Sequence, residues 1–502
     1  MKRRQVVKAM LSGALLAGLP IPLTTARAAL SNPRQPLRAK RHQRDVAIIG
    51  AGIAGLSAGY FLRDLDVVLL EAEQSVGGRS LTGQMGDRTF SKGAQYITSL
   101  NGALGQIITD LGLDPVEIPG QVDAIYRKGK VFIGEDEILQ MFSDRGDLAA
   151  LDHFLDTLSE ISRHYGNVPD HRQDSLVGRL DRQTAREWLN ALRLPPVYPR
   201  VLNNLARRAS GANLDELSAL GLMPILFALF KQTLADMNTD DQARVESGNY
   251  TFDGGLNQVN INLANMLGDR IRFNSAVIQL EKLSDGLGYR ILYADGSGEG
   301  RWVEAKTVIF TSPAPMIMRI AAQLFPSEVL NLLDQVRYAP AITVGLYGSS
   351  PIYSPAFDLS LSDRTFITDI YDACRLSRLD NPDVRTGAVS SVIIPAERFR
   401  DSYFMHLSDR AILSRVHKEL EVVLPGSSDR ILDWSVQRFS HAFPVTTLGA
   451  FRRLSALHGF MESGSPLQLA GDYTIYPSFD LAAESGYLAA MRLRRLLGHT
   501  TA

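Results

Sequence analysis

Three glycines near the start of the chain have the spacing of a dinucleotide-binding turn. Gly50, Gly52 and Gly55 follow the apolar run Val46 to Ile49 in the pattern G-x-G-x-x-G. Such glycines allow a tight turn after a strand, close approach of the backbone to a pyrophosphate, and close packing of the next helix on the strand. The amides at the N-terminus of that helix then point at the phosphates. The residues expected at the cofactor are Gly50, Gly52, Ile53, Ala54 and Gly55.

An acidic residue completes this unit. Glu71 ends a second apolar run, Val67 to Leu70, about 20 positions after the first glycine, where a carboxylate accepts hydrogen bonds from an adenosine ribose and repels a 2′-phosphate. NADP is therefore disfavoured. The alternative is an ordinary glycine-rich junction between a strand and a helix. Two strands buried on both faces, with a helix between them, predict an α/β fold with a Rossmann-type parallel sheet.

The residues after Glu71 carry a second signal. Glu71 and Ala72 are followed by Gly77-Gly78-Arg79-Ser80, in the pattern E-A-x-x-x-x-G-G-R, and later by Gly93-Ala94-Gln95-Tyr96. This combination resembles the flavin monoamine oxidase superfamily, which includes flavin-containing amine oxidases, protoporphyrinogen oxidases and phytoene desaturases. The resemblance implies that the dinucleotide is FAD. It places against the cofactor Ala72, Gly78, Arg79, Ser80, Gly93, Ala94, Gln95 and Tyr96, although Lys92 stands where an acidic or small residue is more usual.

The resemblance returns in two distant blocks. The middle block comprises residues 253–256, 271–277 and 308–313, and the last comprises residues 469–473 and 477–486. The family pattern implies that Val277 holds the adenine end through its backbone and that Ser312 lies at the cofactor. It also implies that Gly471 and Asp472 reach the ribityl phosphate side, and that a helix beginning near Phe479 points its N-terminus at the flavin pyrimidine.

These blocks predict a discontinuous, amine-oxidase-like two-domain architecture. Residues 45–97, 248–315 and 440–499 are expected to form the Rossmann-type FAD-binding domain, and residues 98–247 and 316–439 a mixed α+β substrate-binding domain. Within the latter, apolar spacing predicts a helix over 151–158, and Thr184 to Glu187 has the form of a capping box. Residues 341–347 and 387–394 are expected to be strands.

One long apolar run has two possible functional interpretations. Leu217 to Phe230 could line a substrate tunnel or enter a membrane. Its length is below the ~20 residues of a membrane span, and Pro224 interrupts it. We therefore expect a buried pair of helices.

The N-terminus has the form of an export signal. Arg3 and Arg4 precede a weakly apolar stretch, residues 9–19, and Ala26-Arg27-Ala28 is a cleavage pattern. We expect residues 1–28 to be a twin-arginine signal peptide and residues 29–44 a linker. The twin-arginine translocase is then a partner, and the protein reaches the periplasm or the medium already folded around its cofactor, without a stable membrane span.

The composition of the chain excludes several types of partner and site. The 502-residue chain is 45% hydrophobic and 21% charged, and its net charge of −1 argues against nucleic acid as a partner. One cysteine, Cys374, excludes an intrachain disulfide and a cysteine metal cluster. His153, His164 and His171 lack ligand spacing, so no metal is expected. Because residues 440–446 lack the cysteine that tethers flavin in some family members, we expect non-covalent FAD.

The reaction implied is oxidation of a small organic donor, an amine or amino acid, by hydride transfer to flavin N5, with O2, a quinone or an electron carrier as acceptor. Thr343 aligns with a lysine of many amine oxidases, and Ser478 with an aromatic that clamps the amine. Tyr476 could wall the pocket together with Trp434, Phe439, His441 and Phe443. The candidate catalytic residues are Thr343, Tyr476 and Ser478.

Because this chain has Thr343 and Ser478 in place of that lysine and that aromatic residue, a second type of reaction is also consistent with the sequence. Dehydrogenation of a carbon–carbon or ring bond, as in protoporphyrinogen oxidases and phytoene desaturases, needs neither. A role of another class, non-catalytic binding on the same fold as in Rab GDP-dissociation inhibitors, would not need the full set of phosphate-binding glycines. The donor, the acceptor and the oligomeric state stay open.

Overall fold

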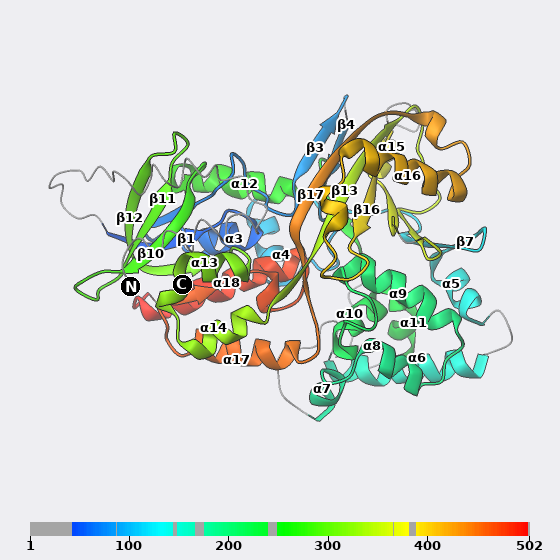
Figure 1. Cartoon of the computed structure of the whole chain (residues 1–502), viewed down its shortest axis with the longest axis horizontal. Coiled ribbons are helices and arrows are strands. Elements are labelled where there is room, and N and C mark those ends of the chain that lie inside the picture. Colours follow the sequence, from blue (N-terminus) through cyan, green and yellow to red (C-terminus); the bar gives the residue numbers. More distant parts are fainter. Residues whose placement is uncertain are drawn as a thin grey trace.

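The structure is a computed structural model that describes residues 43–86, 88–143, 148–165, 175–238, 248–364, 366–380 and 388–499. The predicted signal peptide, the linker up to residue 42, and His171 lie outside the described residues. Gln43 and Arg44, assigned to the linker, are the first residues of strand β1. Two seven-stranded sheets organise the chain, one at the left and one at the upper right of Figure 1.

The first sheet has the strand order β10-β11-β12-β1-β2-β9, with β18 pairing to β12. β1 lies at its centre, parallel to β2 and β12, and its last four residues, Val46 to Ile49, are fully or nearly fully buried. The strands are β1 (Gln43–Ile49), β2 (Val67–Leu70), β9 (Ile271–Arg272), β10 (Ala276–Lys282), β11 (Tyr289–Ala294), β12 (Gly300–Phe310) and β18 (Leu467–Leu469).

Helices cover both faces of the first sheet, which explains its apolar strands. One face packs against α3 (Ile53–Phe61), α4 (Gly102–Asp110), α12 (Asn257–Leu267) and α18 (Phe479–Leu496). The other packs against α13 (Ala314–Ala321), α14 (Ser327–Asp334) and α17 (Ala450–Glu462). Small residues bring α3 and α18 together: a Cβ on Gly486 would lie 2.1 Å from the Ala54 carbonyl oxygen.

The second sheet has the order β17-β13-β16-β15-β14-β6-β7. Its strands are β6 (Asp123–Arg127), β7 (Lys130–Ile133), β13 (Arg337–Gly348), β14 (Asp358–Leu361), β15 (Asp369–Asp372), β16 (Ala388–Pro395) and β17 (Ile431–Val445). One face packs against α16 (Asp409–Val423). The short strands β3 (Thr82–Met85), β4 (Arg88–Ser91), β5 (Val116–Glu117) and β8 (Tyr250–Thr251), and helix α15 (Arg375–Asp380), complete this region.

A group of helices lies below the second sheet in Figure 1. They are α5 (Gly134–Ser143), α6 (Leu148–Tyr165), α7 (Ser175–Leu180), α8 (Ala185–Ala191), α9 (Val197–Ser210), α10 (Ala219–Leu229) and α11 (Lys231–Met237). The helix predicted over 151–158 lies within α6, and the capping box of Thr184 and Glu187 is present at the start of α8. Both predictions are confirmed.

The long apolar run differs from the prediction. It forms one helix, α10, which continues through Pro224, and the break comes at Phe230, where α11 leaves at 88°. The predicted break at Pro224 is wrong. No single helix among the described residues is long and apolar enough to cross a membrane. Only α10 and α11 taken together reach that length and apolar character, and they are bent by 88°. α10 is almost entirely buried in the helical core.

The packing places several elements in a different part of the molecule from the one predicted for their residues. α4, α13 and α14 pack on the first sheet, although α4, α14 and all of α13 except Ala314 and Pro315 lie in the stretches predicted to form the substrate-binding domain. Residues 440–445, assigned to the FAD-binding domain, belong to β17 of the second sheet. The long strands β13 and β17 pair along most of their length.

Candidate cofactor and substrate site

The turn after β1 is built so tightly that two positions admit only glycine. The Gly50 N–H donates to the Leu70 carbonyl oxygen at 2.9 Å, and its φ of +110° is one that L side chains rarely adopt. A Cβ on Gly55 would lie 2.0 Å from the Gly50 carbonyl oxygen. Thr311, after β12, donates its hydroxyl to the Ile49 carbonyl oxygen at 2.8 Å and supports this turn from the side.

Gly52 is different, because space is open in front of it. The nearest atom to a Cβ built there is the Cα of Gly78, at 4.0 Å. Gly52 is also the N-cap of α3, and no side chain caps that helix. Ile53 and Ala54 begin the helix and are buried. A gap between two glycines, beside uncapped helix amides, has the shape and the donors that a pyrophosphate requires.

Glu71 lies beneath the same turn. Its carboxylate accepts hydrogen bonds from the backbone N–H groups of Ala51, at 2.6 Å, and Glu73, at 2.9 Å. Burial raises the pKa of Glu71, although these two hydrogen bonds act in the opposite direction. The Ser275 N–H donates to the Glu71 carbonyl oxygen at 2.7 Å. The start of β10, with Val277, therefore adjoins Glu71, while Ala72 is exposed.

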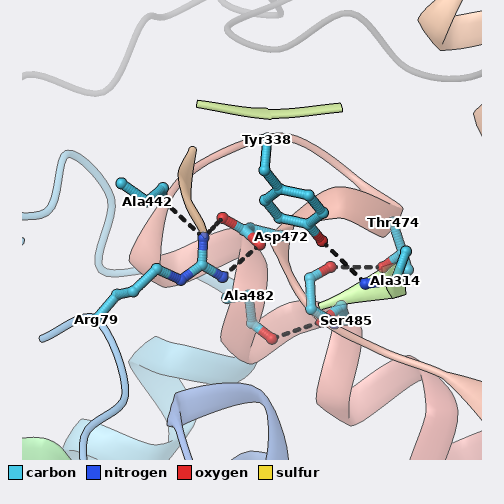
Figure 2. A network of polar contacts seen from close by, with 9 residues as sticks. Arg79, Ala314, Tyr338, Ala442, Asp472, Thr474, Ala482 and Ser485 are labelled. Atoms are coloured by element: carbon cyan, nitrogen blue, oxygen red, sulfur yellow. Dashed lines mark hydrogen bonds and ion pairs between the residues drawn. The ribbon is translucent and has the colours of Figure 1, made fainter. Parts of the chain in front are cut away.

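Arg79 and Asp472 come together from opposite ends of the sequence. Figure 2 shows the guanidinium reaching both carboxylate oxygens, each at 2.7 Å, and the Ala442 carbonyl oxygen at 2.9 Å. Asp472 is 8% exposed. The Tyr338 hydroxyl accepts a hydrogen bond from the Ala314 N–H at 3.3 Å, and burial raises the pKa of this tyrosine. Five chain segments, those of Arg79, Ala314, Tyr338, Ala442 and Asp472, thus meet at the predicted cofactor residues.

The Gly93–Tyr96 block packs directly on Arg79. A Cβ on Gly93 would lie 1.9 Å from the Arg79 carbonyl oxygen, which accepts a hydrogen bond from the Ala94 N–H at 3.1 Å. The Gln95 amide donates to the Gly93 carbonyl oxygen at 2.9 Å. Tyr96 lies edge-to-face on Phe357, with ring centroids 6.0 Å apart. On the other side of Arg79, the Ser80 hydroxyl donates to the Gly77 carbonyl oxygen at 2.9 Å.

Two buried hydroxyls at this site have no hydrogen-bond partner among the described residues, those of Ser312 and Tyr473. Gly471 donates its N–H to the Ser485 hydroxyl at 2.7 Å, and Phe479 is the buried first residue of α18. Buried hydroxyls without a partner are typical of a site for a polar ligand, and that of Ser312 follows Thr311, which supports the turn at Gly50. The residues present therefore fit FAD: Gly52 and Gly78 would hold its pyrophosphate, Glu71 would hold its ribose, and Arg79 and Asp472 would lie along the remainder.

The three candidate catalytic residues lie in different settings. Thr343 is 3% exposed on β13, on the same face as Gly345, where a Cβ would lie 2.4 Å from Phe90 of β4. Ser478 caps α18, its hydroxyl accepting from the Leu481 N–H at 3.2 Å. Tyr476 donates to the Gly221 carbonyl oxygen at 3.1 Å, and it lines a small pocket together with Asp472.

The five aromatic residues do not form one wall. Trp434 packs with the core on the α16 face of the second sheet, whereas Phe439 lies 3.5 Å from a Cβ built on Gly93. His441 contacts Tyr338, with ring centroids 5.3 Å apart. Burial lowers the pKa of His441, and the positive charges of Arg79 and Arg319 lower it further.

Sequence reasoning missed several residues that shape this site. Thr311 precedes a predicted residue, and Ser485 stands inside the last motif block, so their neighbours could have pointed to them. Tyr338 and Asn260, whose amide donates to the Ser80 hydroxyl at 2.7 Å, belong to no motif. Among the described residues, no group of three or more His, Cys, Asp or Glu side chains is arranged to hold a metal ion.

Comparison with known proteins agrees with this geometry. The sequence model of the family described as flavin containing amine oxidoreductase matches residues 53–494. The chain is 24% identical over 282 residues to human amine oxidase [flavin-containing] B, covering 55% of this chain and 51% of that protein. It is 22% identical over 486 residues to the L-amino-acid oxidase of Demansia vestigiata, covering 91% and 88%. The first of these matches thus spans about half of the relative's length.

Solved structures share the fold along nearly the whole chain. A putrescine oxidase variant superimposes with a TM-score of 0.70 at 20% identity, covering 91% of this chain and 100% of that chain. Cyclohexylamine oxidase from Brevibacterium oxydans gives 0.68 at 18% identity, with the same two coverages. A putative protoporphyrinogen oxidase from Exiguobacterium gives 0.65 at 18% identity, covering 92% and 100%.

Proposed function

This chain belongs to the family of flavin-containing amine oxidoreductases, and from that premise we propose that it oxidises an amine or amino acid by hydride transfer to N5 of a non-covalently held FAD. As a member of that family it is an FAD-dependent oxidoreductase. The observation that carries the donor class is the relationship to an L-amino-acid oxidase over 91% of the chain, which includes both sheets.

When FAD is bound, it supplies the two-electron acceptor. The residues of this chain bind the cofactor and orient the donor. The amides of α3 and the gap at Gly52 would hold the pyrophosphate. The buried face around Thr343 excludes water from the donor and holds its C–H bond near the acceptor atom. The N-terminus of α18 at Phe479 would supply positive dipole character to the pyrimidine edge of a bound flavin, a contribution on the order of 1 kcal/mol.

A dehydrogenase acting on a carbon–carbon or ring bond is the second candidate. Thr343, which is buried and uncharged, favours it, because a cation at this position would help oxygen accept electrons. Such an enzyme would pass its electrons to a quinone or a partner protein. An amine oxidase would pass them to O2.

Anaerobic addition of amines, amino acids and porphyrinogens to the purified yellow protein tests the donor class. We expect an amine or amino acid to bleach the visible flavin band. Bleaching by a porphyrinogen alone would favour the second candidate. Acid precipitation tests the linkage: non-covalent FAD stays in the supernatant, whereas a covalently held flavin sediments with the protein.

We also propose export through the twin-arginine pathway, supported by Arg3, Arg4 and the cleavage pattern at residues 26–28. Replacing both arginines by lysine keeps the charge and removes the recognised pair. We expect the variant precursor to accumulate in the cytoplasm, folded and yellow. Normal export of this double variant, measured by cell fractionation, would contradict the proposal.

A further inference from the structure

A small pocket lies where the end of β17 and the segment before α18 meet α17. Its apolar wall comprises Val336, Val445, Leu454, Leu457 and Ile475. Arg453 of α17 and Asp472, which Figure 2 shows paired with Arg79, also line it. We call this space the α17 pocket. It adjoins the predicted cofactor residues at Asp472.

The α17 pocket is separate from the face of the second sheet that carries Thr343. Thr343 does not belong to its wall. Tyr476, another candidate catalytic residue, does, but its hydroxyl is engaged by the Gly221 carbonyl oxygen of α10 at 3.1 Å. The pocket therefore has its own set of free groups.

The guanidinium of Arg453 has no carboxylate beside it. It donates to the Leu448 carbonyl oxygen and to the Thr447 hydroxyl, both at 2.9 Å. Among the described residues, no Asp or Glu side chain forms an ion pair with it. Burial lowers the pKa of Arg453, and the positive charge of Arg337 lowers it further, although Asp181 acts in the opposite direction. An anion beside Arg453 would thus stabilise its charge.

The two carboxylates of this region are already engaged. Asp181 is 2% exposed, and it accepts hydrogen bonds from the N–H groups of Phe451, at 3.3 Å, and Arg452, at 3.1 Å. It thus caps α17 and lies outside the wall of the pocket. Asp472 receives both of its hydrogen bonds from Arg79. Neither carboxylate is free to pair with Arg453.

The size and lining of the α17 pocket limit the ligand. Its cavity of about 30 Å³ holds about two or three water-sized groups, each of which takes about 10–15 Å³. Thr446 and Tyr473 belong to its wall and are 6% exposed, and their hydroxyls have no hydrogen-bond partner among the described residues. A short apolar chain with an anionic, hydrogen-bonding end matches this combination.

We propose that the α17 pocket binds a short-chain monocarboxylate of about four carbon atoms, with its carboxylate at Arg453 and its alkyl chain against Leu454 and Leu457. This ligand is distinct from FAD and from the donor, so the inference does not depend on which donor is oxidised. The alternative is that Arg453 only ties residues 447–448 to α17.

Calorimetric titration of the holoenzyme compares butyrate with 1-butanol, which has the same chain without the charge. We expect butyrate to bind at least about tenfold more tightly, because hydrogen bonds to charged groups are the stronger ones. Inorganic phosphate, which has no apolar part, should not displace butyrate. Equal affinity for butyrate and 1-butanol, or no binding of butyrate, would overturn the proposal.

Substitutions locate the bound butyrate. Arg453→Gln should weaken its binding at least about tenfold. Arg452→Gln is the matched control, because Arg452 is the preceding residue but is exposed and lies outside the pocket; its affinity for butyrate should equal that of the wild-type protein. Ala450→Val, which narrows the pocket and keeps its charge, should also weaken binding, and it serves should Arg453→Gln fail to fold. Wild-type affinity in Ala450→Val and in a folded Arg453→Gln would place butyrate elsewhere.

Thermal unfolding tests the alternative. A ligand that binds the folded state raises the melting temperature as its concentration increases. We expect butyrate to do so in the wild-type protein, and to do so less in Arg453→Gln, relative to the same concentration of sodium chloride. If Arg453 is only a tie, Arg453→Gln melts at a lower temperature and butyrate has no more effect than sodium chloride on either protein.

Discussion

The turn after β1 and a group of charges on the second sheet both present polar atoms to buried space, but they draw these atoms from different sources. At the turn, the groups proposed to hold the cofactor are backbone amides and the space beside Gly52, and Gly50, Gly52 and Gly55 contribute no side chains. The second group, which we call the Arg208 cluster, consists of charged side chains: Arg208 of α9, Asp123 of β6, Asp358 of β14 and Asp369 of β15. The proposed phosphate site thus depends on backbone geometry, whereas the cluster depends on side-chain charge.

The two regions should therefore respond differently to substitution. At the turn, an added side chain either clashes with the protein backbone or fills the space proposed for the cofactor, depending on where its Cβ points. In the cluster, an aspartate can be replaced by asparagine, which keeps the shape of the side chain and removes its charge. The following predictions separate these responses, beginning with the largest effect.

Gly55→Ala should prevent stable folding. The added Cβ would lie 2.0 Å from the Gly50 carbonyl oxygen, and relieving that overlap moves α3 away from β1 at a cost of more than about 3 kcal/mol. Yield of soluble protein and urea unfolding measure the effect. Gly459→Ala is the control, because no atom lies within 4 Å of a Cβ built on Gly459 in α17. If the Gly55→Ala variant unfolded at the same urea concentration as the wild-type protein, the packing argument would be refuted.

Gly52→Val should give a folded protein without FAD. No protein atom lies nearer than 4.0 Å to a Cβ at Gly52, so the fold tolerates it, but the side chain fills the gap assigned to the pyrophosphate. The ratio of FAD to protein after purification, together with the circular dichroism spectrum, checks both halves of this prediction. A full complement of FAD would show that the gap serves no cofactor.

Thr343→Lys should speed reoxidation of the reduced enzyme by O2 about tenfold, because a cation near the flavin stabilises the negative charge that develops on oxygen. Thr343→Met is the control, since it adds length without charge. Stopped-flow mixing of dithionite-reduced enzyme with oxygenated buffer measures the rate. Fast reoxidation of the wild-type protein, or no gain from the lysine, would favour an oxidase over the dehydrogenase.

The smallest effect concerns stability and pH. Burial raises the pKa of Asp369 from 3.8 to about 6, so the folded state holds this proton more tightly than the unfolded state. The resulting stabilisation is complete below pH 4 and is lost as the pH rises through 6. Urea unfolding across this range should show a slope in the wild-type protein that is reduced in Asp369→Asn; identical slopes would contradict it.

Much of the cofactor site could be predicted from the sequence. β2 begins and ends at the predicted residues, Val67 and Leu70, and the expected strand Val46 to Ile49 lies within β1. The capping box at Thr184 is likewise present. These features depend on residues a few positions apart, whose types dictate local backbone geometry. The family blocks extended the prediction to Arg79 and Asp472, which the structure joins in one ion pair.

The Arg208 cluster could not be predicted in this way. Its members are scattered between residues 123 and 369, and none belongs to a motif. The packing of α13 and α14 on the first sheet and the unbroken path of α10 through Pro224 also appeared only in the structure. By itself the sequence determined the flavin family and the backbone of the phosphate-binding turn. Tertiary structure alone decided which charges share one buried space, because strand register and helix packing bring distant side chains together.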